Sequence, residues 1–145
     1  MARQVNFFHA AKRHYNDAEL LLNHKREANA GHLYGFASEC GIKQLLVING
    51  LPTDPATGDI ERADITRQYR VHIDKLVNSM SVFLSGRGAA RYTAMVPTIG
   101  CFSSWEVAHR YYTDSALPPS VSDWRKATEE VMRMLFQAEL DGVMP

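Results

Sequence analysis

Cysteine is scarce in this chain of 145 residues: it holds only Cys40 and Cys101, with no CxxC pair and no mixed Cys/His spacing. A disulfide framework or a metal site is therefore not expected, and Cys40 is expected to behave as a small core hydrophobe. The N-terminus lacks the apolar run of a signal peptide, and no apolar stretch is long enough for a membrane span. These absences predict a cytoplasmic protein with no membrane segment.

The chain also lacks an excess of charge, because 16 Lys and Arg residues balance 16 Asp and Glu residues. No strong overall field therefore attracts nucleic acid or an anionic membrane. Only residues 62–91 are mildly basic, which more often indicates a solvated surface than a phosphate site. A Gly-rich phosphate loop, a GxSxG elbow, an HExxH motif and a catalytic carboxylate pair are all missing, so no cofactor is predicted.

Helical periodicity dominates, and no run alternates convincingly with a period of two. We expect a single all-α domain over 1–145, a four- to five-helix up-and-down bundle with antiparallel neighbours. A polar, mobile loop is expected over 53–68. The expected helices span about 5–26, 31–50, 71–84 and 120–140, with a further helix over 87–96 and a short element over 103–111 that begins with a capping box.

The segment 31–50 is apolar almost all the way round a helix, which is typical of the centre of a bundle or of a shared subunit interface. It carries Glu39 and Lys43, in the order and spacing of a helical ion pair. We interpret the pair as a brace for a bundle or dimer core, with a polar interface site as the alternative. His14 is expected to be a core histidine hydrogen-bonded to a neighbour such as Glu39.

One short motif, Arg67 to His72, has the form R-x-x-x-x-H. An imidazole can exchange protons near neutral pH while a guanidinium stabilises phosphoryl charge, so such a pair could cleave a phosphodiester without metal. Five residues on a helix separate the side chains by about 140°. They would converge only across a bend or a dimer interface, and a solvated arginine beside a helix-start histidine is the simpler interpretation.

A second cluster, Trp105 to Tyr111, concentrates aromatic and basic side chains that include His109 and Arg110. It could stack on a base and clamp a phosphate. Alternatively, Trp105 and Tyr111 pack a loop against the bundle, which we favour.

The order of these features resembles a diverged member of the HEPN (higher eukaryotes and prokaryotes nucleotide-binding) superfamily over roughly residues 5–140. The resemblance lies in HYNDAELL at 14–21, YGFASECGIKQLL at 34–46, VHIDKL at 71–76, the Trp105…Arg110-Tyr111 element and the closing amphipathic helix. It implies a helical bundle that dimerises through its helices. Members are either metal-independent ribonucleases, often toxins of toxin–antitoxin or antiviral systems, or non-catalytic modules associated with nucleotidyltransferases.

The family's ribonuclease motif usually lies on a helix in the second half of the domain, whereas Arg67 and His72 lie earlier. His72 instead matches the His-x-x-x-Leu position of the non-catalytic branch. We therefore expect a homodimeric nucleotide- or RNA-binding module, working with a separate nucleotidyltransferase. The alternatives are a ribonuclease that uses Arg67 and His72, and a structural domain without ligand. The candidate phosphate or base contacts are Arg67, Arg70, His72, Arg91, His109, Arg110 and Tyr111.

Overall fold

The computed structural model describes residues 3–144 as an all-α helical bundle, which confirms the predicted fold class. Within that range no strand forms, and the only bridge joins Thr53 and Ile60. The α-helices are α1 (Phe7–Asn23), α2 (Glu27–Ile48), α3 (Ile73–Leu84), α4 (Ala90–Thr93) and α5 (Val121–Leu140). Four 3-10 helices fill the connections: η1 (Asp64–Tyr69), η2 (Ile99–Ser104), η3 (Val107–Tyr111) and η4 (Asp114–Ala116).

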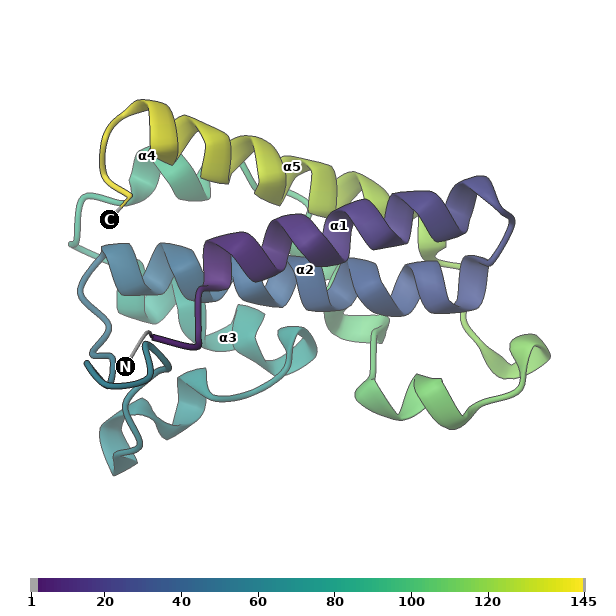
Figure 1. The fold of residues 1–145 in the computed structure, drawn as a ribbon, viewed down its shortest axis with the longest axis horizontal. Coiled ribbons are helices and arrows are strands. Elements are labelled where there is room, and N and C mark those ends of the chain that lie inside the picture. The colour runs from purple at the N-terminus through teal and green to yellow at the C-terminus, as the bar shows by residue number, and fades with distance from the viewer. Residues whose placement is uncertain (1–2, 145) are drawn as a thin grey trace.

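Helices α1 and α2 form an antiparallel hairpin, and α5 lies against both (Figure 1). The chain between α4 and α5 crosses from one end of the molecule to the other, so α5 runs in the same direction as α2 (Figure 1). This long connection contains η2, η3 and η4. None of the described helices is both long and apolar enough to cross a membrane.

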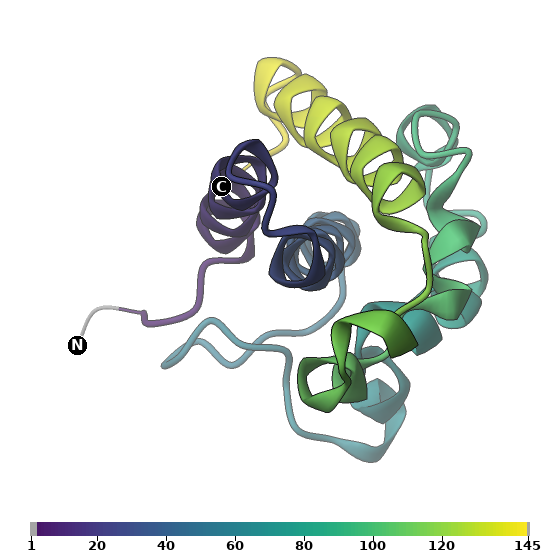
Figure 2. The ribbon, with the colours of Figure 1, turned by 90° about the vertical axis from the view of Figure 1, so that its right-hand side faces the viewer.

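Helix α2 lies at the centre, with α1, α5 and the α3–η3 side arranged around it (Figure 2). The sequence offered a bundle centre or a subunit interface for this helix, and the structure shows the bundle centre. Its buried residues cover most of its circumference, as the complete burial of Tyr34, Ile42 and Leu46 illustrates. The remaining face is a stripe of half-buried residues: Leu33, Phe36, Cys40, Lys43 and Val47. Its own chain covers most of α2, and the expectation that this helix also forms a dimer interface stays a prediction.

Three glycines of α2 let other elements approach it closely: Gly31, Gly35 and Gly41. A Cβ on Gly35 would lie 2.2 Å from the Trp105 ring, and one on Gly41 would lie 2.3 Å from Val131. A glycine inside a helix costs about 1 kcal/mol relative to alanine. That cost is offset here because an indole and a valine pack directly on the helix backbone.

The turn between α1 and α2 differs from the expected boundaries, because α1 ends at Asn23 and α2 begins at Glu27. The chain reverses at Lys25, whose φ of 60° places a non-glycine residue in the left-handed region. The amides of Lys25 and Arg26 donate to carbonyls of the last turn of α1, which ends the helix.

The predicted helix over 87–96 shrinks to the single turn of α4, because Gly86 and Gly88 both have a φ of 73°. The predicted capping box at 103–106 is also wrong. Glu106 is instead the N-cap of η3, and its backbone N–H donates to Nδ1 of His109 over 3.4 Å.

The polar loop over 53–68 contains more regular structure than its lack of periodicity suggested. It holds η1 and several backbone hydrogen bonds, among them Asp54 N–H to the Asp59 carbonyl at 2.8 Å. The amide of Val5 donates to the Thr57 carbonyl over 2.9 Å, which ties the loop to the start of the chain. Its mobility stays a prediction.

Candidate functional site

The polar centre of the molecule is Glu39, which lies on α2 and is only 8% exposed. Its Oε2 accepts a hydrogen bond from Nζ of Lys43 over 3.1 Å. Its Oε1 lies 2.9 Å from Nδ1 of His72. A buried carboxylate needs such partners because desolvating it alone is costly. The structure thus gives the expected Glu39–Lys43 contact a third member, His72.

His14 was expected to be the partner of Glu39, and the structure corrects this. Its ring packs near Phe36, with centroids 5.9 Å apart, and no described hydrogen bond joins it to Glu39. Burial lowers the pKa of His14, which favours its neutral form. The partner that sequence reasoning missed, His72, is 33 residues from Glu39 along the chain.

His72 is placed by the start of α3, where it is the N-cap residue in an extended conformation. Its side chain is 45% exposed, so the ring reaches from the buried Glu39 toward solvent. When the neutral ring donates its Nδ1–H to the carboxylate, Nε2 is left as the acceptor. That arrangement suits a ligand hydrogen bond or a proton transfer.

Aromatic rings pack around this histidine. His32 stacks on Trp105 with centroids 5.0 Å apart, and Phe36 meets the rings of His32, His72 and Trp105 edge-on. Trp105 is fully buried. Its Nε1 and both ring nitrogens of His32 are buried with no partner among the described residues. Burial, followed by the nearby Arg110, His109 and His72, lowers the pKa of His32.

His72 opens onto a surface hollow of about 440 Å³ between the first turn of α3 and η3. A second hollow, of about 480 Å³, lies over η1 and shares Arg70 and Val71 with the first. We call the two together the trough. Its charged lining comprises Arg62, Arg67, Arg70, His72 and Lys75 on the cationic side and Asp64, Asp74 and Glu106 on the acidic side.

The structure places Arg67 and His72 in different halves of the trough. Arg67 is 82% exposed and pairs with Asp64 at 3.0 Å, and no described hydrogen bond joins it to His72. Arg70 is held more firmly, since it pairs with Asp59 at 3.2 Å and also donates to the Ile60 carbonyl.

The remaining predicted contacts separate into two groups. Arg91 lies on α4, outside the trough, and pairs at 3.1 Å with Asp141 just after α5. His109 has a side chain only 8% exposed and stacks on Trp124, so it packs η3 against α5. Arg110 and Tyr111, by contrast, face outward on η3, with the guanidinium 4.9 Å from a ring that is 77% exposed.

Sequence reasoning missed Lys75 as a trough residue, although its position three residues after His72 gave a usable signal. Residues three apart on a helix share a face, and α3 begins at Ile73. A basic residue in the first turn is also unusual, because the helix dipole favours acids there.

No protein-family model, curated protein or solved structure matches this chain. The residues of the trough are therefore the basis for proposing a function.

Proposed function

We propose that this protein is a HEPN-like module that binds single-stranded RNA along the trough. The observation that supports it best is the continuity of the two hollows, which place four Lys and Arg side chains and His72 along one surface path. Phosphates are spaced regularly along a nucleic-acid strand, so a row of cations is the pattern that recognises them.

The acids in the trough weaken this attraction without cancelling it. Asp64 is 95% exposed and its pair with Arg67 is equally open to water. Exposed pairs of this kind contribute about 0–1 kcal/mol, so a phosphate can replace Asp64 as the partner of Arg67 at little cost. Arg70 is fixed by Asp59 and can present its remaining N–H groups in a constant orientation.

An exposed aromatic side chain lies on the helix that forms one wall of the trough. Tyr111 belongs to η3, whose Val107 and Ala108 line the hollow beside His72. Base stacking on such a ring contributes about 1–3 kcal/mol and tolerates any base. Arg110, already against the Tyr111 ring, would extend the stacking surface.

The resemblance to the non-catalytic HEPN branch supports two further proposals: a homodimer and a partnership with a separate nucleotidyltransferase. Because its own chain covers most of α2, a homodimer through this helix would have to use its half-buried stripe. Light scattering that gives twice the chain mass would support it, and a single-chain mass would contradict it.

The RNA proposal is tested by fluorescence anisotropy with a labelled single-stranded oligonucleotide at several salt concentrations. We expect the double variant Arg67→Gln/Lys75→Gln to bind at least tenfold more weakly and with a shallower salt slope, because each cation lost removes one phosphate contact. Arg91→Gln is the matched control outside the trough and should bind like the wild type. Equal losses of affinity in both variants, or no binding by the wild type, would contradict the proposal. The remaining interpretation would then be a structural domain that binds no ligand.

One observation favours a second function, a metal-independent ribonuclease: the contact between Glu39 and His72 resembles the carboxylate–imidazole arrangement that orients a general base. His72 could accept the proton of a ribose 2′-hydroxyl, and Arg67 would stabilise the phosphoryl charge only if the chain bends or pairs with a second copy. RNA cleavage in EDTA that is lost in His72→Gln would support this function. An intact substrate with the wild-type protein would exclude it.

A further inference from the structure

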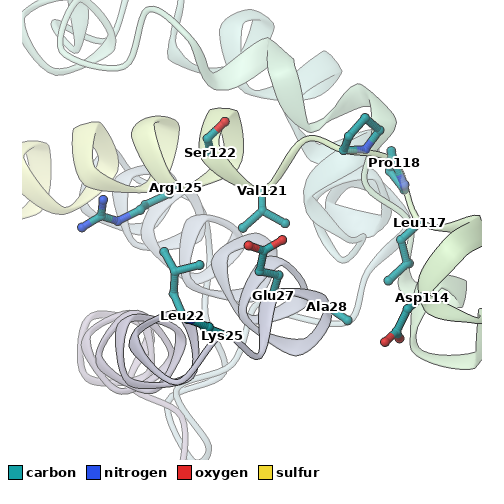
Figure 3. Close-up of a pocket in the computed structure, with 11 residues that line it drawn as sticks. Leu22, Lys25, Glu27, Ala28, Asp114, Leu117, Pro118, Val121, Ser122 and Arg125 are labelled. Carbon is teal, nitrogen blue, oxygen red and sulfur yellow. The ribbon is translucent and has the colours of Figure 1, made fainter.

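A surface cavity of about 650 Å³ lies away from the trough, between the α1–α2 turn and the start of α5 (Figure 3). Its volume is in the range of small-molecule sites. Much of its wall is apolar, contributed by Leu22, Ala28, Leu117, Pro118, Pro119 and Val121.

One of the cations in this lining is already neutralised. The guanidinium of Arg125 donates two hydrogen bonds to Glu19, at 2.9 and 3.0 Å, and lies 3.5 Å from Glu129. Arg125 and Tyr34 both donate to Glu19, and together they lower the pKa of that carboxyl group. In Figure 3 the Arg125 side chain extends away from the centre of the cavity.

Two carboxylates of the lining, by contrast, have no internal partner. The side chains of Glu27 and Asp114 make no hydrogen bond or ion pair within residues 3–144. In Figure 3 the Glu27 carboxylate points into the space below Val121, while Asp114, the first residue of η4, lies below Leu117 on the opposite side of the cavity. Two acids on different walls therefore border an apolar floor.

The geometry points to a binding site for an aliphatic diamine or polyamine in this cavity. Each ammonium group would meet one of the carboxylates, Glu27 or Asp114, and the methylene chain between them would pack on Leu22, Leu117 and Val121. A compact metal cation would gain nothing from the apolar walls, and an uncharged apolar ligand would gain nothing from the acids.

Lys25 also borders the cavity and opposes such a ligand, since it has no ion pair among the described residues. Replacing it by a neutral residue should therefore tighten binding, whereas replacing either acid should weaken it. General attraction to an acidic surface would give changes of the same signs, so an acid of equal charge far from the cavity is needed as a control.

The test is isothermal titration calorimetry of the purified protein, without RNA, with three ligands of equal chain length. We expect 1,6-diaminohexane to bind more tightly than hexylamine, which lacks the second charge, and than 6-aminohexanoate, whose carboxylate would face an acid. Equal affinity for all three ligands, or tighter binding of 6-aminohexanoate, would overturn the proposal. A lysine-rich peptide that binds while 1,6-diaminohexane does not would also overturn it, in favour of a protein partner.

The residues to be substituted are exposed at the surface, so the variants should fold like the wild type, and circular dichroism checks this. We expect Glu27→Gln and Asp114→Asn each to weaken diamine binding by about three- to fivefold, and Lys25→Gln to tighten it by a similar factor. Glu139→Gln, an equal charge change at the other end of α5, should have no effect. Unchanged affinity in the acid variants would refute the site, and this outcome is independent of RNA binding in the trough.

Discussion

Two regions of the molecule differ in how their polar groups are paired. The first comprises the helices α1, α2 and α5, and the second comprises the connecting segments 49–72 and 85–120. Between the three helices, buried polar side chains form hydrogen bonds with each other: the hydroxyl groups of Ser38 and Thr128 lie 2.9 Å apart, and both residues are fully buried. In the connecting segments the Arg67–Asp64 pair is open to water, and the Arg70–Asp59 pair is partly open. These three helices therefore act as a scaffold, and the connecting segments provide Arg62, Arg67 and Arg70 of the trough.

The largest effect is expected where the two regions touch. Gly35→Ala places a Cβ 2.2 Å from the buried Trp105 ring, so the indole or the helix must move. We expect a loss of about 3 kcal/mol or more in the free energy of unfolding, measured by urea denaturation. Gly100→Ala is the matched control in the connecting segment, where an added Cβ has no neighbour within 4 Å. If the two variants lost equal stability, close packing at Gly35 would not hold the regions together.

A smaller loss is expected for Glu39→Gln, which leaves the Lys43 ammonium group without its anion at a side chain only 12% exposed. Breaking a largely buried pair by removing one partner should cost about 2–3 kcal/mol. Asp64→Asn breaks an exposed pair and should change stability by less than about 0.5 kcal/mol. Thermal and urea unfolding of both variants checks the difference, and equal effects would mean that Glu39 is solvated.

The smallest effect is a dependence of stability on pH through His32. Its pKa is lowered in the folded protein, chiefly by burial, so below pH 6.5 the unfolded chain binds a proton that the folded one resists. Stability is therefore full above pH 6.5 and falls as the pH drops toward the lowered pKa. We expect His32→Gln to flatten this fall, with His14 supplying a remaining part of the same sign. A wild-type curve that is flat from pH 7 to 5 would contradict it.

The main helices could be predicted from sequence because their apolar residues recur at helical spacing. Their ends were harder to predict where the turn chemistry is unusual: nothing between Asn23 and Glu27 resembles a helix break, since Lys25 occupies a conformation that glycine normally takes. Gly86 and Gly88 are visible in the sequence, but only their positive φ values show that they delay the start of α4.

The candidate site was predicted only in part, for a related reason. Local spacing identifies the Glu39–Lys43 pair, because four residues on a helix are neighbours. The contact between Glu39 and His72, however, depends on how α3 packs on α2, which no local pattern contains. The sequence also did not predict that Trp124 packs against Gly31 and Trp105 against Gly35, because these contacts too depend on how distant segments pack.

Trp105 and Trp124 are the only tryptophans of the chain, and both are buried where the connecting segment meets the scaffold. Trp105 is in ring contact with His32, and Trp124 lies near His109. Indole emission is sensitive to water and to a neighbouring imidazolium. The protein therefore contains a natural optical probe, in which unlabelled fluorescence reports whether the segment that carries Arg110 and Tyr111 is docked or detached.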